Sequence, residues 1–344
     1  MSSRFAFPNN DFLAYTLANP VECAPQTFSI KEGHVYLEDT GILRIEPNVS
    51  SATSLVVSVG VHGNETGPIE LINAMLKDIL SNELALKVRL LVLIGNPVSA
   101  NAGRRFMDVN MNRLFSKAWE SFDCPEAIRA QRLENAVQRF YELGGKSGLR
   151  LHYDLHTAIR ESEYEKFAVY PFDHGAGYSQ AQLRFLAASG LDAVLLSHQP
   201  TTTFSYYTNR VFGAHSFTVE LGKVYPFGEN DLSRFTDIDF SLRKLISTAG
   251  LLNGDLNRIK IFSVEAALIK DSEDYELNIG VNVKNFTGFA KGYCLASSAL
   301  SSYLIKVDGD AIIFPNANVP IGQRTGLVVR PTLLENLLLL DELG

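Results

Sequence analysis

An apolar strand, a glycine-rich turn and a helix follow one another in residues 54–80, SLVVSVGVHGNETGPIELINAMLKDIL. Residues 55–59 form an apolar run of strand length, and the apolar residues from position 69 to 79 recur at helical spacing. The turn contains three glycines, which permit backbone conformations that other residues resist, and Pro68 suits the first turn of a helix. This order predicts a strand-turn-helix unit whose turn is held between two rigid elements, where functional side chains usually lie.

The rest of the chain alternates apolar strands with amphipathic helices, which predicts an α/β fold with its ligand site beyond the strand ends. We expect strands at residues 27–30, 34–37, 41–45, 88–94, 149–157, 193–197 and 215–221, and helices at 11–17, 129–143, 180–188 and 237–251. Residues 103–115, rich in Arg and Asn, and the polar segment 201–209 are expected to be loops.

The α/β pattern ends at Asn253, Gly254 and Asp255. Beyond residue 259, strand-forming residues alternate with Gly, Asn and Asp turns, which predicts a small antiparallel β unit. We therefore expect an α/β domain at 1–254 and a β-rich carboxy-terminal domain at 255–344. The leucine-rich end, residues 333–343, is expected to form a helix that docks on the protein.

Composition excludes several classes of protein. The 344 residues, 46% of them hydrophobic, can bury a large core. A net charge of −7 without a basic run argues against a general nucleic-acid surface, and no segment approaches the roughly 20 apolar residues of a membrane helix. The amino terminus lacks an apolar segment of signal-peptide length. Three widely spaced cysteines favour free thiols over a disulfide framework, so we expect a cytoplasmic protein.

His62 and Glu65, in the turn of the opening unit, can bind one cation if the turn brings them together. The strand expected at 149–157 carries the candidate third ligand, His156, near its exit, with His152 as the rival. Two imidazoles and one carboxylate form a usual catalytic zinc shell that leaves a position open for water. From spacing alone, an isolated H-x-x-E is more often a chance match than a ligand pair; the strand-turn-helix placement and the polar strand face that ends at His156 strengthen the metal hypothesis.

Two further carboxyl groups, those of Glu220 and Asp154, are candidates for roles beside the metal. Glu220 lies near the exit of the strand expected at 215–221 and is our candidate general base; the alternative is a strand-end carboxylate in a salt bridge. Asp154 lies two residues before His156 and shares its strand face, so it either orients that ligand or makes an unrelated buried polar contact.

Four motifs occur in the order seen in a known family of enzymes: GVHGNETGP at 60–68, NMNR at 110–113, DLHT at 154–157 and VELG at 219–222. The chain resembles the succinylglutamate desuccinylase and aspartoacylase branch of the zinc carboxypeptidase-like enzymes over nearly its full length. This resemblance implies an α/β fold with a mixed central sheet flanked by helices, and a smaller carboxy-terminal β-rich domain.

The resemblance also implies residue roles. It implies one zinc ion held by His62, Glu65 and His156, and it selects His156 over His152. It implies Glu220 as general acid and base. Arg105 matches an arginine that helps to stabilise the oxyanion, and Asn112 with Arg113 matches a pair that binds a substrate carboxylate; the alternative for both arginines is a solvated loop.

The implied reaction is zinc-dependent hydrolysis of the amide of N2-succinylglutamate, a small anionic substrate of arginine catabolism. Because that substrate carries three carboxylates, Asn112 and Arg113 cannot bind them all, and further cationic side chains are required. The candidates flank the motif-bearing strands, with ordinary surface charge as the alternative for each: Arg160, Lys166, Arg210 and Lys223. Arg104 is equally compatible with a site role and with solvent exposure.

Two further functions fit the sequence. A related site would remove a different acyl group from an amino acid or cut a carboxy-terminal peptide residue. A metal-holding module without turnover is the other hypothesis, and the presence of Glu220 and Arg105 argues against it, because storing a metal requires neither.

Overall fold

The computed structural model describes residues 7–145 and 147–341. In this part of the chain, thirteen strands form one sheet in the order β1-β2-β3-β5-β4-β6-β10-β7-β9-β11-β17-β16-β13. The strands of the amino-terminal part are β1 (Gln26–Ile30), β2 (Gly33–Asp39), β3 (Ile42–Pro47), β4 (Thr53–Val59), β5 (Arg89–Ile94), β6 (Leu149–Ala158), β7 (Lys166–Tyr170), β8 (Tyr178–Ser179), β9 (Ala193–Leu196) and β10 (His215–Lys223). The helices are α1 (Phe12–Ala18), α2 (Thr66–Leu80), α3 (Pro97–Asn101), α4 (Pro125–Leu143), α5 (Gln180–Ala188), α6 (Phe204–Phe212) and α7 (Thr236–Thr248).

The centre of the sheet is parallel. Strands β5, β4, β6 and β10 are neighbours that run in the same direction, whereas β7 is antiparallel to β10 and the hairpins of β1, β2 and β3 are antiparallel. Carboxyl ends of parallel strands meet at one edge of a sheet. The turns after β4, β6 and β10 therefore come together, and the expected α/β fold with a mixed central sheet is confirmed.

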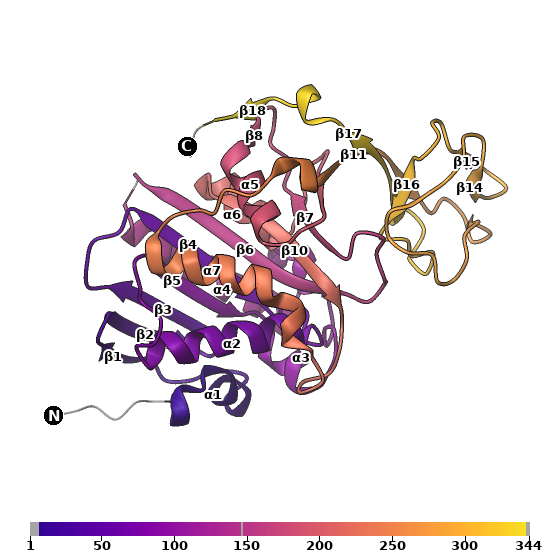
Figure 1. Cartoon of the computed structure of the whole chain (residues 1–344). Coiled ribbons are helices and arrows are strands. Elements are labelled where there is room, and N and C mark those ends of the chain that lie inside the picture. Colours follow the sequence, from indigo (N-terminus) through magenta and orange to yellow (C-terminus); the bar gives the residue numbers. More distant parts are fainter. Residues whose placement is uncertain (1–6, 146, 342–344) are drawn as a thin grey trace.

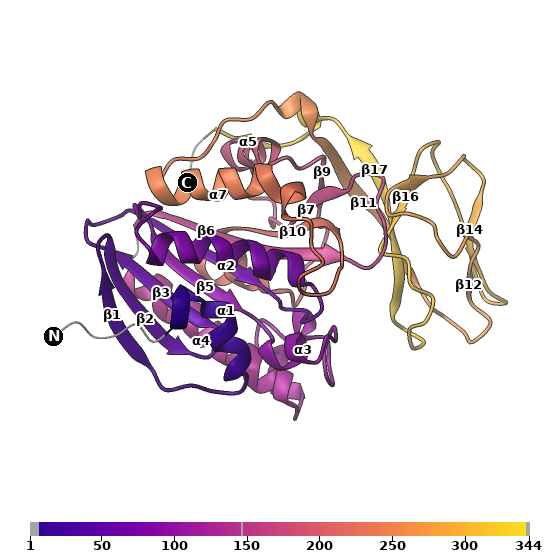
Figure 2. The same ribbon diagram turned by 60° about the horizontal axis from the view of Figure 1, so that its bottom comes forward.

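Helices cover both faces of this sheet (Figures 1 and 2). On one face, Leu55, Val57 and Val59 of β4 belong to a core shared with α2, α5 and α7. On the other face, Val56 of β4 belongs to a core shared with α4 and α6. Strands β4 and β5 are thus buried on both sides, which explains why their sequences are nearly continuous apolar runs and do not alternate.

The carboxy-terminal β unit continues the main sheet. Its strands are β11 (Lys260–Ile269), β12 (Glu276–Leu277), β13 (Thr287–Gly288), β14 (Cys294–Ser297), β15 (Ser302–Leu304), β16 (Ala311–Ile313), β17 (Arg324–Thr332) and β18 (Leu339–Leu340). Strand β11 pairs in parallel with β9, and β17 joins β11 to β16. Strands β12, β14 and β15 form a separate small sheet at the far end of the unit (Figures 1 and 2). We propose that residues 1–254 and 255–344 form the two domains that the sequence predicts.

Two expectations were wrong. The segment 201–209, expected to be a loop, contains most of helix α6, which Thr203 caps by accepting a hydrogen bond from the Tyr206 amide and which Gly213 ends in the left-handed conformation. The leucine-rich end, expected to be a helix at 333–343, forms a short 3-10 turn at Leu334–Asn336 and then β18, which pairs with β8, as far as the described residues extend.

Helix α4 is longer than expected because Pro125, at its first position, starts it four residues before Arg129. Among the described residues, no helix combines the length and the apolar character that crossing a membrane requires.

Candidate metal centre

The turn after β4 is shaped by glycines that no other residue can replace without a shift. Gly60 has a φ of +62°, and a β-carbon on Gly63 would lie 2.3 Å from the backbone of Ser99 and Ala100. The Gly63 amide donates to the carbonyl of Arg105 at 3.0 Å. The turn is therefore pressed against α3 and tied to the segment that carries Arg105.

This turn and the end of β6 bring together His62, Glu65 and His156, as the sequence predicts. All three are buried, and their ligand atoms lie within 4.8 Å of one another. The Nδ1 atom of His62 lies 2.8 Å from Glu65 Oε1, and the Nδ1 atom of His156 lies 2.8 Å from Glu65 Oε2. The two imidazoles thus approach one carboxylate from its two oxygens.

The surroundings of the two rings fit a cation. The outer nitrogen of each ring faces a side-chain oxygen: His62 Nε2 lies 2.9 Å from Asn110 Oδ1, and His156 Nε2 lies 2.8 Å from Asp154 Oδ2. A neutral imidazole that donates through Nε2 has its lone pair on Nδ1, the atom that faces Glu65. The donor set is therefore arranged for a metal ion at Nδ1, with Asn110 and Asp154 as the outer partners that fix each ring.

The charges of the cluster follow from burial and pairing. Burial raises the pKa of Glu65, but the positive charges and hydrogen bonds of His62 and His156 outweigh it and hold this pKa well below the usual range. Burial lowers the pKa of His62 despite the nearby Glu65. For His156, burial lowers the pKa, but two carboxylates, Asp154 and Glu65, outweigh it and hold the pKa well above its usual value, so a metal ion binds at Nδ1 by displacing the ring proton there. Glu65 is thus a carboxylate, ready to bind a cation.

His152 does not belong to the cluster. Its Nε2 lies 2.7 Å from Ser58 Oγ and its Nδ1 lies 2.8 Å from Thr208 Oγ1. Each ring nitrogen is therefore hydrogen-bonded to a hydroxyl group and is not available to a metal ion. Burial lowers the pKa of His152 to about 4, and the ring is neutral. Ser58 also donates to Asp154 at 2.5 Å, so a buried chain of hydrogen bonds supports the aspartate that orients His156.

Glu220 lies beside the cluster on the adjacent strand. It is paired in register with His156, and residues in register on parallel neighbours share a face of the sheet. Its Oε2 atom is buried and has no hydrogen-bond partner among the described residues. Burial, with smaller contributions from Glu65 and Asp154, outweighs His156 and Arg105 and raises the pKa of Glu220 to about 7. A carboxyl group of this pKa can both accept and return a proton near neutral pH.

Arg105 reaches the cluster from the segment after α3. Its Nη1 donates to Glu65 Oε1 at 2.6 Å, and the arginine side chain is 32% exposed whereas Glu65 is 1% exposed. The guanidinium therefore lies at the border between the buried carboxylate and solvent, where it can also meet a ligand.

The 110–113 segment is anchored by helix α6. Asn112 is buried, and its Oδ1 accepts a hydrogen bond from the Phe204 amide at 2.9 Å. Arg113 is exposed and donates to the Asn112 carbonyl at 2.7 Å. Sequence reasoning missed both α6 and the role of Asn110; the cap at Thr203 and the glycine at 213 were the available signals for the helix.

Three of the four further cationic candidates have partners within the protein. Arg160 donates to two backbone carbonyls, Lys166 donates to the Arg234 carbonyl, and Lys223 lies 3.7 Å from Glu161. Arg210 is exposed in the last turn of α6, and Arg104 is exposed as well.

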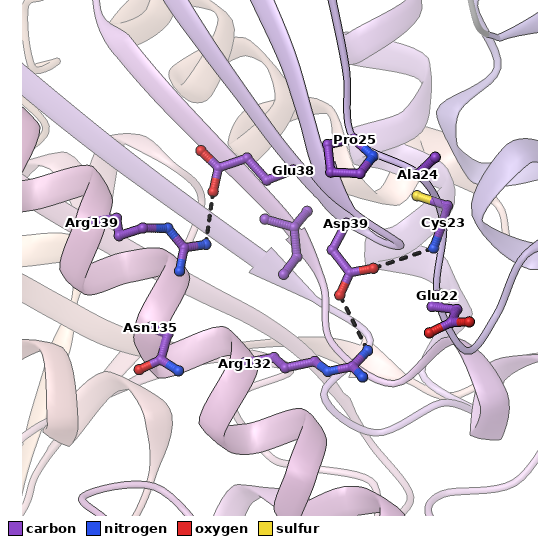
Figure 3. Close-up of a pocket in the computed structure, with 10 residues that line it drawn as sticks. Glu22, Cys23, Ala24, Pro25, Glu38, Asp39, Arg132, Asn135 and Arg139 are labelled. Atoms are coloured by element: carbon purple, nitrogen blue, oxygen red, sulfur yellow. Dashed lines mark hydrogen bonds and ion pairs between the residues drawn. The ribbon is translucent and has the colours of Figure 1, made fainter.

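A cavity of about 720 Å³ lies elsewhere, between α4, β2 and the segment before β1 (Figure 3). None of the predicted site residues lines it. Its charged side chains are largely paired, Arg132 with Asp39 and Arg139 with Glu38. We propose the buried cluster as the site of the chemistry because, among the described residues, it is the one group of candidate metal ligands, and it lies beside a carboxyl group with an unpaired buried oxygen.

Models of two domain families match this chain. The model of the succinylglutamate desuccinylase/aspartoacylase catalytic domain matches residues 51–246, and that of the AstE/AspA barrel-sandwich hybrid domain matches residues 257–332. The succinylglutamate desuccinylase of Shewanella amazonensis is 44% identical, over 93% of this chain and 95% of that relative.

Solved structures give the same result. The succinylglutamate desuccinylase structure from Vibrio parahaemolyticus superposes with a TM-score of 0.88 at 34% identity, covering 96% of both chains. The structure from Chromobacterium violaceum gives a TM-score of 0.84 at 39% identity, covering 94% of this chain and 98% of that one.

Proposed function

Because the chain belongs to the succinylglutamate desuccinylase/aspartoacylase family, we propose that it hydrolyses the amide bond of N2-succinylglutamate to succinate and glutamate. The observation that carries this proposal is the unpaired Glu220 carboxyl group beside the cluster of His62, Glu65 and His156. A metal-storage site does not need such a group.

We propose zinc as the metal held by His62, Glu65 and His156. Two imidazoles and a carboxylate form a shell that zinc favours, and they leave a position free for water or substrate. When bound there, zinc supplies Lewis-acid chemistry, which withdraws electrons from the scissile carbonyl and makes water more acidic. Each of the three ligands is already oriented by the fold, which is what a catalytic metal site requires.

The protein's own groups supply the proton transfers. Glu220 takes the proton from the attacking water and later gives it to the departing amine of glutamate, so the carboxyl group returns to its starting state. Its pKa of about 7 suits both directions near neutral pH. Arg105 donates hydrogen bonds to the oxygen of the former carbonyl as negative charge develops on it. No covalent bond between enzyme and substrate is needed.

Asn112 and Arg113 are proposed to bind a substrate carboxylate. The Asn112–Phe204 hydrogen bond fixes the segment. Among the described residues, the Arg113 guanidinium donates to the Asn112 carbonyl and has no ion pair, so it retains donors for a substrate carboxylate. The three cysteines have no disulfide, which is compatible with a cytoplasmic enzyme.

The test is the release of glutamate from N2-succinylglutamate, measured beside N-acetylaspartate and a short peptide at equal concentrations. We expect turnover of the succinyl compound to exceed that of the other two. Preferential turnover of acetylaspartate or of the peptide would reassign the substrate within the family. A zinc-loaded protein that is inactive on all three compounds would support the metal-binding module instead.

A further inference from the structure

The carboxy-terminal β unit is fastened to the segment that leaves the metal cluster. Residues 159–163 follow β6, which carries His156. Asn285 is 1% exposed; its amide donates to the Glu161 carbonyl at 2.8 Å, and its carbonyl accepts from the Glu163 amide at 2.9 Å. Its side chain donates to Ser162 Oγ at 3.1 Å and accepts from the Phe314 amide at 2.8 Å. One buried asparagine thus joins this segment to the end of β16.

Arg160 strengthens the same junction. Its guanidinium donates to the carbonyls of Val281 at 2.9 Å and Val283 at 2.6 Å. Arg160, which the sequence suggested as a substrate-binding residue, therefore holds the β unit in place. The junction fixes the β unit against the segment that follows β6, the strand that carries His156.

Arg324, the first residue of β17, differs from the other arginine of that strand. Arg330 pairs with Asp310 and with Glu265 at 2.7 and 2.8 Å. Arg324 is partly buried, yet it has no ion pair or side-chain hydrogen bond within residues 7–145 and 147–341. A guanidinium that loses water without gaining a partner is costly, so its position calls for an anion.

The charge of Arg324 acts on two basic groups, Arg113 and His198. Loss of hydration, then the charge of Arg324 and then that of Arg105 lower the pKa of Arg113 to about 10, so Arg113 remains charged at neutral pH. Burial and then Arg324 also lower the pKa of His198. Of the three arginines, Arg105 has a carboxylate partner, Glu65, while Arg113 and Arg324 have none in the described structure.

We propose that Arg324 binds, together with Arg113, a substrate carboxylate remote from the scissile amide, so that the carboxy-terminal β unit supplies part of the active site. Two guanidinium groups that repel each other are both stabilised when a carboxylate lies between them. This inference rests on the proposed function, whose substrate carries two such remote carboxylates: the one at the end of the succinyl group and the one on the glutamate side chain.

The test compares Arg324→Met, which removes the charge, and Arg324→Lys, which keeps it, with Lys291→Met, a matched loss of charge at an exposed position of the same β unit. We measure kcat/KM for N2-succinylglutamate, and inhibition constants for N-acetylglutamate, which lacks the succinyl carboxylate, and N-succinyl-2-aminobutyrate, which lacks the side-chain carboxylate. The zinc content and melting temperature of each variant establish that it is folded.

We expect Arg324→Met to lower kcat/KM about tenfold to a hundredfold, mainly through KM, Arg324→Lys to lower it less, and Lys291→Met to leave it unchanged. The truncated compound whose inhibition constant is unaffected by Arg324→Met identifies the carboxylate that Arg324 binds. Unchanged kinetics in a folded Arg324→Met variant, or equal losses with all three compounds, would overturn the proposal.

Direct binding separates this proposal from the proposed function. If the wild-type protein does not turn over N2-succinylglutamate, the proposed function fails, and calorimetric titrations with succinate and with glutamate still test the anion site. Weaker binding of either compound by Arg324→Met than by Lys291→Met supports the site; equal binding of both compounds by the two variants, or binding of neither by the wild type, overturns it.

Discussion

Replacing Glu220 by glutamine should make the protein less active and more stable. The carboxyl group lies beside His156, and its buried Oε2 atom has no hydrogen-bond partner among the described residues. Burial raises its pKa to about 7 from an ordinary value of 4.5. Glutamine has almost the same shape but carries no charge and cannot accept the proton of water. The variant should therefore fold with the same packing and lose the proposed general base.

The sign of the stability change follows from the pKa. A group whose pKa is raised on folding contributes stability that is complete below its unfolded pKa and is lost as the pH rises through its folded pKa. For Glu220 in metal-free protein, this loss occurs between about pH 4.5 and pH 7. Above that range, the ionised buried carboxylate costs up to about 3 kcal/mol of unfolding free energy relative to glutamine. Partial exposure of the residue makes this an upper bound.

The assay is the melting temperature of wild type and Glu220→Gln in EDTA from pH 4.5 to 8.5, with glutamate release measured on the zinc-loaded proteins. The variant should gain a few degrees over wild type as the pH rises, and its kcat should fall about 10²- to 10⁴-fold. Glu229→Gln, which removes the same charge at an exposed site, serves as the control. A difference in melting temperature that does not change with pH, or full turnover by Glu220→Gln, would refute this reasoning.

Further variants test the metal site and its support. His156→Ala should leave little zinc on the purified chain by elemental analysis, and a full complement of zinc would remove His156 from the ligand set. Asp154→Asn should weaken zinc binding about 10- to 100-fold in competition with a chelator, because it alters the partner of His156 Nε2; unchanged affinity would leave Asp154 with a packing role only. Gly63→Ala should lower both the melting temperature and the zinc content, because its β-carbon would lie 2.3 Å from backbone atoms, whereas Gly280→Ala has no atom within 4 Å and should change neither.

The sequence predicted best those parts of the fold in which local pattern and tertiary environment agree. Residues 55–59 lie in a strand buried on both faces, so a continuous apolar run was a sufficient signal. The alternation at 149–157 separated His152 and His156 from the apolar face of β6, as the structure shows. The ligand cluster was also predictable, because two of its members lie in one turn and the family motifs selected the third.

The errors arose where distant contacts decide the structure. The aromatic and hydroxyl residues of helix α6 have a weak helix propensity, so the sequence predicted a polar loop. In the structure, Phe204 and Tyr207 are buried against α4 and the sheet, and the Phe204 amide donates a hydrogen bond to Asn112. The leucines near residue 339 form a strand because β8, about 160 residues earlier, offers a partner. Arg324 carries no local motif, and only the docking of the β unit brings it near Arg113.

The most direct test of the proposed zinc hydrolase is a titration of metal-stripped protein with zinc, with glutamate release from N2-succinylglutamate measured at each addition. The proposal predicts negligible turnover without metal, an increase in proportion to added zinc, and a plateau at one zinc ion per chain, the number that the cluster of His62, Glu65 and His156 can hold. Full turnover by the stripped protein, or turnover that does not respond to zinc, would contradict it.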